Sequence, residues 1–201
     1  MSEHWPLPLK GERKKAFKAA TQKKSSLFVY PTETYYALGC RGDDPQAVEK
    51  IFQLKGRDPN APLLLLVSDW EMFETWAEVA NDQVIEELRQ HWPGPLTYVG
   101  KAKKGLAPEL NREGESLGFR WTAHPMAQDL IRLLGVPLVG TSANLSGRPP
   151  IREIVLVKEE LGEAVDFYLD GGPTQGGLVS TVASWKDGDW QILRQGAVTI
   201  G

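Results

Sequence analysis

Residues 31–40, PTETYYALGC, form a polar segment with a glycine near its end, and they directly follow an apolar run at residues 27–30. A second segment of this kind, VGTSANLSG at residues 139–147, is entered from the run PLVG at 137–140. Short apolar runs of this kind are typical of buried strands, and polar loops at strand ends carry chemistry more often than packing. We therefore expect both loops to belong to a functional site built on a sheet.

The composition is that of a globular chain. Of the 201 residues, 41% are hydrophobic and 24% are charged, which at this length favours a single domain over residues 1–201. The formal net charge is only −3, so the overall field would not attract polyanions such as nucleic acids. The basic helical pattern at residues 10–24 is better explained by a solvated helix face than by RNA contact.

The use of cysteine and histidine excludes several kinds of site. The single Cys40 offers no disulfide framework, and His4, His91 and His124 lack the clustered spacing of metal ligands. The longest apolar run, at residues 62–67, is far shorter than the roughly 20 residues that span a bilayer. Residues 1–10 lack the apolar core of a signal peptide. We expect a cytoplasmic protein with no membrane contact and no metal held by protein side chains.

Patterns typical of strands and helices alternate along the chain. Helices are expected at residues 10–24, 45–55, 70–77, 82–92 and 124–134, and strands at 27–30, 63–67, 96–99, 116–121, 137–140, 165–169, 179–185 and 190–193. Asp44 and Pro45 predict a helix start, and Pro31 is expected to stop a strand. The alternation predicts an α/β fold with a twisted, open, mixed sheet, flanking helices and a site on the loops beyond the strand ends.

Cationic and small polar side chains recur in these loops. They are Thr32, Thr34, Lys55, Arg57, Arg120, Ser142, Asn144, Ser180, Thr181 and Arg194. Arginine and lysine bind phosphate and carboxylate groups, so this set suits a phosphorylated substrate that also bears a carboxylate. The motifs GxxxxGK[ST], GxGxxG and GxSxG are absent from the sequence, so a nucleotide site here would be of another kind.

Each of these residues also has an ordinary structural interpretation. Most lysines and arginines lie at protein surfaces, and Asn144 suits a cap or turn as well as a binding role. Residues 32–34 could form a turn closed by side-chain hydrogen bonds. The seven tryptophans are better explained by core or rim packing than by stacking on bases. Residue chemistry alone therefore leaves binding and structural roles open.

Several segments, taken in order, resemble the YrdC/TsaC family of threonylcarbamoyl-AMP synthases in its short, single-domain form. They are PTETYYALGC at 31–40, KGRDPNAPL at 55–63, WPGPLT at 92–97, GFRWTAHP at 118–125, TSANLSG at 141–147, STVASW at 180–185 and ILRQG at 192–196. The resemblance implies a YrdC-like α/β fold with a cationic concave cleft. It also implies a nucleotidyltransferase that joins L-threonine, bicarbonate and ATP into threonylcarbamoyl-AMP and releases pyrophosphate.

The resemblance further implies partners in tRNA modification. Partner enzymes of the family move the threonylcarbamoyl group to the adenosine beside the anticodon, and any direct contact of this chain with tRNA would be weak. Magnesium is expected with the triphosphate and not in a cage of protein carboxylates. Glu33, an acidic residue inside the first loop, is not expected to bind metal.

The resemblance also assigns roles to individual residues. Thr32 and Thr34 would bind threonine, and Arg120 would bind its carboxylate. Lys55 and Arg57 would be catalytic, facing ATP and the carbonate-derived group. The nucleotide and its phosphates would be bound by Lys55, Arg57, Ser116, Ser142, Asn144, Ser180 and Arg194. Fixed cations would offset the charge that develops when a carbamate attacks the α-phosphorus.

The chain departs from the family pattern at a few positions. Ala37 replaces a glycine, Asp58 a proline and Ala61 an asparagine or histidine, and Leu64 to Leu66 stand where a histidine is often found. Two alternatives follow. One is a non-catalytic RNA-binding relative, and the other is a domain that uses carbamoyl phosphate to form carbamoyl-AMP.

Overall fold

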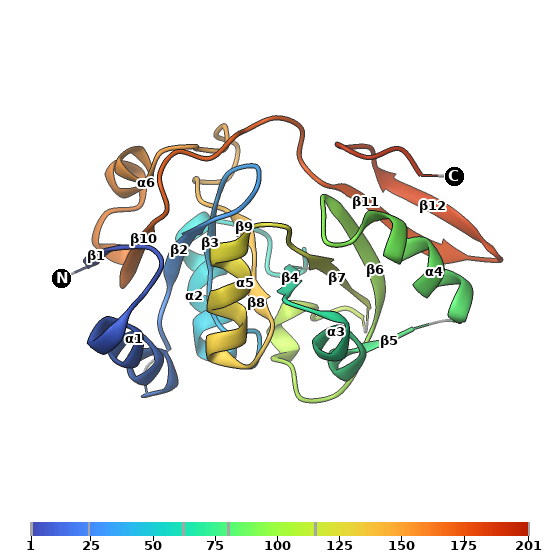
Figure 1. Ribbon diagram of the computed structural model, residues 1–201, viewed down its shortest axis with the longest axis horizontal. Helices are drawn as coiled ribbons and strands as arrows, with labels where there is room; N and C mark the ends of the chain where they lie inside the picture. The colour runs from blue at the N-terminus through green and yellow to red at the C-terminus, as the bar shows by residue number, and fades with distance from the viewer. Residues whose placement is uncertain (1, 24, 62, 80, 115, 201) are drawn as a thin grey trace.

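The computed structural model describes residues 2–23, 25–61, 63–79, 81–114 and 116–200. Its strands form two mixed sheets, ordered β1-β10-β2-β3-β9 and β12-β11-β6-β7-β4-β8, with β5 paired to β6. The predicted α/β class is confirmed, whereas the division into two sheets is not visible in the sequence. The sheets lie side by side along the long axis, the first at the β1 end and the second at the β12 end (Figure 1).

The elements have the following bounds. The first sheet contains β1 (Glu3–Pro6), β2 (Phe28–Pro31), β3 (Tyr36–Gly39), β9 (Thr141–Ser142) and β10 (Phe167–Asp170). The second contains β4 (Leu64–Val67), β5 (Ala77–Glu78), β6 (Leu96–Ala102), β7 (Ser116–Trp121), β8 (Leu138–Val139), β11 (Thr181–Lys186) and β12 (Asp189–Arg194). The helices are α1 (Gly11–Lys23), α2 (Pro45–Lys55), α3 (Trp70–Trp76), α4 (Asp82–His91), α5 (Pro125–Leu134) and α6 (Ile154–Leu161).

The first loop is shorter than the sequence predicts. Tyr36 to Gly39, expected as part of that loop, form β3, which is buried throughout. The strand β2 ends at Pro31, as predicted, although Pro31 itself pairs with Tyr36 as the last residue of the strand. Proline is tolerated there because a strand end can dispense with one N–H donor. The turn is therefore confined to residues 32–35.

Other differences concern short elements. The elements β1, α6 and β9 lie where no helix or strand was expected. Residue 77, expected as the last residue of a helix, begins β5, and β6 continues to residue 102. Two-residue strands depend on a partner brought close by the fold, so a local pattern rarely indicates them. Lys24 and Pro62, which close the predicted helix and open the apolar run, lie outside the described residues.

The chain crosses from the second sheet to the first at residues 138–142. The strand β8 pairs with β4, and β9 pairs with β3. At this crossing the N–H of Val139 donates to the carbonyl of Cys40 at 2.9 Å. A Cβ on Gly39 would lie 2.1 Å from the Val139 carbonyl oxygen, so only glycine fits here. The second loop is thereby held where the two sheets meet.

Aromatic side chains fill much of the core of the second sheet. The ring of Phe73 lies 4.9 Å from Trp92, 5.7 Å from Phe119 and 6.0 Å from Tyr98, each in an edge-to-face arrangement. The indole N–H of Trp92 donates to the Leu96 carbonyl at 2.7 Å. Trp92 therefore packs in the core, as expected.

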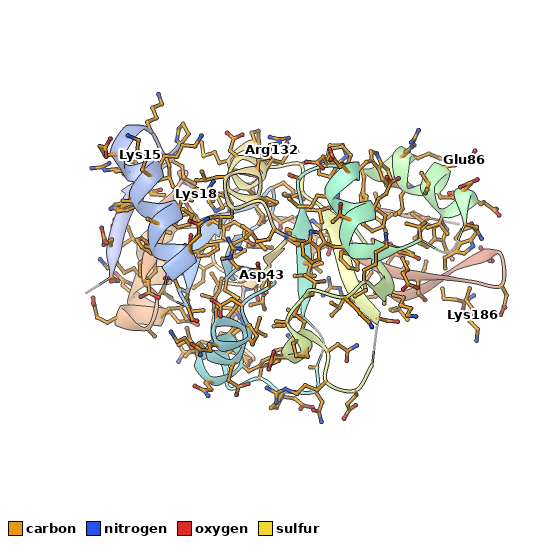
Figure 2. The ribbon with its side chains drawn as sticks, turned by 90° about the horizontal axis from the view of Figure 1, so that it is seen from below. Lys15, Lys18, Asp43, Glu86, Arg132 and Lys186 are labelled. Atoms are coloured by element: carbon orange, nitrogen blue, oxygen red, sulfur yellow. The ribbon has the colours of Figure 1, made fainter. Side chains whose placement is uncertain are left out.

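The helix α1 lies at the β1 end of the molecule. Its Lys15 and Lys18 are exposed (Figure 2), whereas Phe17 is fully buried. The predicted exposed basic face is confirmed, and the preference for solvation over RNA contact stays a prediction. Among the helices of the described residues, none is long and apolar enough to cross a membrane.

Candidate active site

A cavity of about 500 Å³ lies at the junction of the two sheets. Its walls come from β4, β6, β7, β11 and β12 on one side and from β3, β9 and the turn 32–35 on the other. The predicted site residues that line it are Thr32, Thr34, Arg57, Ser116, Arg120, Ser142, Ser180 and Arg194. Lys55 and Asn144 do not line it. The fold thus gathers most of the predicted set around one cavity.

The first loop is a closed turn. The hydroxyl of Thr32 donates to the Tyr35 carbonyl at 2.7 Å, and the Thr34 N–H donates back to the Thr32 oxygen at 3.4 Å. The Thr34 carbonyl accepts the N–H of Gly176 at 2.7 Å, and the Tyr35 hydroxyl donates to the Gly177 carbonyl at 2.8 Å. The glycine-rich segment 171–177 therefore fixes the turn from outside. Thr32 has the structural role that the turn requires and also faces the cavity.

Lys55 stabilises the second loop through hydrogen bonds to its backbone. Its ammonium donates to the carbonyls of Ser142 at 2.6 Å and Asn144 at 2.7 Å, and only 5% of the residue is exposed. It reaches this position because α2 begins at the Asp44 cap, where the carboxylate accepts the Ala47 N–H at 3.0 Å, as predicted. Burial, followed by the charge of Arg57, lowers the pKa of Lys55 to about 8.

Asn144 also holds the backbone of this loop. Its amide donates to the carbonyls of Leu145 at 2.9 Å and Arg148 at 2.8 Å. Its side-chain oxygen is buried and has no hydrogen-bond partner among the described residues. Asn144 thus has the structural role in a turn that was one of its two interpretations. The roles of Lys55 and Asn144 in binding a ligand stay predictions.

Arg57 follows α2 after a left-handed glycine. Gly56, at φ 58°, ends the helix, and the Arg57 N–H donates to the Phe52 carbonyl at 3.1 Å. The residue is half-buried, and this burial lowers the pKa of the guanidinium, with the charge of Asp58 acting in the opposite direction. An arginine nevertheless stays protonated at neutral pH, so Arg57 brings a fixed positive charge to the cavity wall.

Arg194 and Ser180 form a second anchored group on β12 and the start of β11. The guanidinium of Arg194 donates to the Ser180 carbonyl at 2.9 Å and to its hydroxyl oxygen at 3.2 Å. The Ser180 and Thr97 hydroxyls lie 2.9 Å apart. Burial and the nearby charge of Arg120 lower the pKa of Arg194. The cavity therefore holds two arginines that repel one another.

Arg120 projects from β7, and its partner comes from the first loop. Its guanidinium forms an ion pair with the carboxylate of Glu33, and that carboxylate also accepts the hydroxyl of Thr122 at 2.8 Å. The side chain of Arg120 is 6% exposed. A buried arginine needs a counter-charge, but no local pattern shows which acidic residue provides it. Sequence reasoning therefore missed this use of Glu33 and Thr122.

Apolar and aromatic side chains complete the cavity. Tyr36, Val179, Val182 and Leu193 line it together with backbone of Gly118 and Gly140. Among the described residues, none of the lining side chains is a carboxylate. The expected cationic character of the cleft stays a prediction.

Fold and cavity together define an α/β protein with a cavity, lined by arginine and hydroxyl groups, at the junction of two mixed sheets. Residues 21–196 match the model of the Sua5/YciO/YrdC family, whose description is telomere recombination. The chain belongs to this family, which confirms the resemblance seen in the motifs.

Named relatives give the match more detail. Threonylcarbamoyl-AMP synthase of Bacillus subtilis is 35% identical over 182 residues, covering 90% of this chain and 53% of that protein. The protein of that name from Photobacterium profundum is 34% identical over 151 residues, covering 74% of this chain and 82% of that protein. The structure of P. abyssi Sua5 complexed with L-threonine matches with a TM-score of 0.88 and 28% identity, over 98% of this chain and 57% of that chain. The chain thus spans about half the length of the first and third of these proteins and most of the second.

Proposed function

We propose that this protein is a threonylcarbamoyl-AMP synthase that uses L-threonine, bicarbonate and ATP. The observation that carries the proposal is that Arg57, Arg120 and Arg194 line one cavity together with hydroxyls of both loops. The names of the relatives and the threonine bound to P. abyssi Sua5 support it. The volume of about 500 Å³ lies within the range of small-molecule sites.

The reaction needs groups of the kind that line the cavity. The amine of threonine attacks the carbon of bicarbonate, and water leaves as the carbamate forms. A carbamate oxygen then attacks the α-phosphorus of ATP, and pyrophosphate leaves. Both steps bring anions together, so positioned cations lower the barrier. In this proposal Arg120 binds the threonine carboxylate beside Thr32 and Thr34, and Arg57 and Arg194 face the phosphates.

The remaining predicted residues have supporting places in the same scheme. Ser116, Ser142 and Ser180 contact the nucleotide from the cavity wall, while Lys55 and Asn144 keep the second loop in the shape that the nucleotide requires. Mg²⁺ is expected with the triphosphate. Because the lining of the described residues contains no carboxylate, phosphate oxygens and water would hold the ion, and no step is assigned to it.

The wider role is part of the same proposal. The product would pass to partner enzymes that modify the adenosine beside the anticodon of tRNA, in the cytoplasm, and the chain would act as a single domain. Direct tRNA contact would be weak, because the chain carries a net charge of −3 and such binding depends on neutralising phosphates.

Calorimetric titration with L-threonine and ATP, separately and together, tests the proposal before any turnover is assayed. Threonine should bind, its affinity should increase with ATP, and serine, which lacks the methyl group, should bind more weakly. Incubation with all three substrates should then yield threonylcarbamoyl-AMP and pyrophosphate. Arg57→Ala should lower kcat/KM by roughly 10²–10³-fold, as expected when one positioned donor is lost.

Other results would assign the chain to another function. Folded protein that binds tRNA in a salt-sensitive way but ignores threonine and ATP would be a non-catalytic RNA-binding relative. Carbamoyl phosphate that supports adenylate formation, where threonine with bicarbonate does not, would indicate a carbamoyl-AMP-forming domain.

A further inference from the structure

The carboxylate of Glu33 links the first loop to the strand β7. One of its oxygens is paired with Arg120, and the other accepts the hydroxyl of Thr122 at 2.8 Å. Arg120 and Thr122 lie two residues apart along the extended chain, so their side chains point to the same side. Glu33 bridges both groups and thereby ties the first sheet to the second.

Of the three residues in this contact, only Arg120 faces the cavity. Arg120 lines the cavity, whereas neither Glu33 nor Thr122 does. The side chain of Glu33 is 18% exposed and Thr122 is fully buried. Glu33 therefore holds Arg120 from behind, and a ligand in the cavity would meet the guanidinium and not the carboxylate.

Charge keeps this pair ionised. Burial would raise the pKa of Glu33, but the charge of Arg120, the loop backbone and the Thr122 hydroxyl together hold that pKa below its usual value. Two further titratable groups interact with Glu33: burial lowers the pKa of the His124 imidazole, and burial raises the pKa of the Tyr30 hydroxyl, so that it stays neutral. At neutral pH the Glu33 carboxylate is thus charged and the His124 imidazole is neutral. Arg120 is therefore paired with the negative charge of Glu33, which does not line the cavity.

The ion pair with Glu33 does not use every N–H donor of Arg120. Its Nε–H is buried and has no hydrogen-bond partner among the described residues. A buried donor without an acceptor costs about 1–3 kcal/mol, so the contacts of Arg120 with the protein leave part of the hydrogen-bonding capacity of its guanidinium unused. The charge of Arg120 also contributes to lowering the pKa of Arg194, and an anionic ligand between the two guanidiniums would offset this repulsion.

We propose that Glu33 is a positioning residue for the amino-acid subsite: it orients Arg120, with support from Thr122, so that the guanidinium presents its remaining donors to the substrate carboxylate. This inference rests on the proposed function, which supplies threonine as the amino acid. It adds a role for the acidic residue of the PTET segment, which acts through Arg120 and does not touch the substrate.

Two variants test the inference by removing each side of the link. Glu33→Gln keeps the size of the side chain but removes its charge, and Thr122→Val keeps the shape but removes the hydroxyl. The dissociation constants of threonine and ATP are measured separately for each protein by calorimetry. We expect Glu33→Gln to weaken threonine binding at least about tenfold and Thr122→Val to weaken it about threefold, as for charge-assisted hydrogen bonds, with ATP binding changed less than about twofold.

Thr122→Ser is the matched control, because it keeps the hydroxyl that donates to Glu33. It should bind threonine within about twofold of the wild type if one hydrogen bond explains the loss in Thr122→Val. Equal weakening of threonine and ATP in Glu33→Gln, or unchanged threonine binding there, would overturn the inference while leaving the synthase intact. Wild-type protein that ignores threonine would overturn the proposed function, and this inference with it.

Discussion

At the scale of single residues, the arginines of the cavity are held by contacts that fix their direction. Arg194 donates twice to Ser180, and that serine in turn contacts Thr97. The guanidiniums of Arg194 and Arg120 are thus placed before a ligand arrives, which is what electrostatic catalysis requires. Basic residues elsewhere differ in this respect: Lys14, Lys15 and Lys18 of α1 are exposed and do not line the cavity.

Replacing Arg194 by alanine should reduce kcat/KM by roughly 10²–10³-fold, equivalent to about 2.7–4 kcal/mol of transition-state stabilisation. Steady-state kinetics with threonine, bicarbonate and ATP measure the loss. Arg13→Ala is a suitable control, because Arg13 is exposed on α1 and its removal should change kcat/KM less than about twofold, as for surface positions. An equal decrease in kcat/KM in both variants would show that Arg194 has no specific role in the reaction.

Lys55 leads to a prediction about pH. Burial and the charge of Arg57 lower its pKa to about 8 in the folded protein, from a usual value of 10.5. Between these values the unfolded chain binds the proton and the folded chain does not, so stability from this group rises with pH. This contribution is complete above pH 10.5 and is lost as the pH falls through about 8.

Denaturant unfolding of the wild type and Lys55→Met measures this effect. The difference in their unfolding free energies should increase in favour of the wild type from about pH 7 to about pH 9.5, and the comparison cancels every group that both proteins share. At neutral pH the variant should still be less stable by about 1–3 kcal/mol, because the Ser142 and Asn144 carbonyls lose their donor. A constant difference across this pH range would mean that the pKa of Lys55 is not lowered.

At the scale of elements, the crossing from β8 to β9 depends on the close approach of β3. Gly39→Ala would place a methyl group against the Val139 carbonyl and the Tyr30 ring, so we expect a loss of about 1–3 kcal/mol in unfolding free energy. Gly114→Ala is the matched control, since its Cβ would meet only the end of the Asn111 side chain at 3.3 Å. Thermal unfolding followed by circular dichroism compares the two, and similar small effects would show that β3 can move away from β8.

At the scale of the whole molecule, a ligand in the cavity would contact both sheets and should stabilise the entire fold. Threonine and ATP, each present at about 100 times its dissociation constant, should each add about 2.7 kcal/mol to the unfolding free energy. Differential scanning fluorimetry at increasing ligand concentration measures the shift in Tm. A shift given by an unrelated amino acid such as aspartate at equal concentration would argue against a specific site.

Features that depend on neighbouring residues can be read from the order of amino acids alone. The Asp44-Pro45 start of α2 and its exit near Lys55 follow from local backbone chemistry, and the loops carry the arginines and hydroxyls that indicate an anionic ligand. The family resemblance, too, is a property of ordered local motifs. The helix and the family are confirmed, and the nature of the ligand stays a prediction.

The meeting of distant segments becomes visible only in the folded molecule. The division of the strands into two sheets is one such feature. Three others are contacts between residues far apart in the chain: the pairing of β9 with β3, the ion pair of Glu33 with Arg120, and the hydrogen bonds of Lys55 to the second loop. Such contacts arise because buried backbone groups and buried charges must each find a partner. Which partner is found depends on how the sheets pack, and no local pattern records that choice.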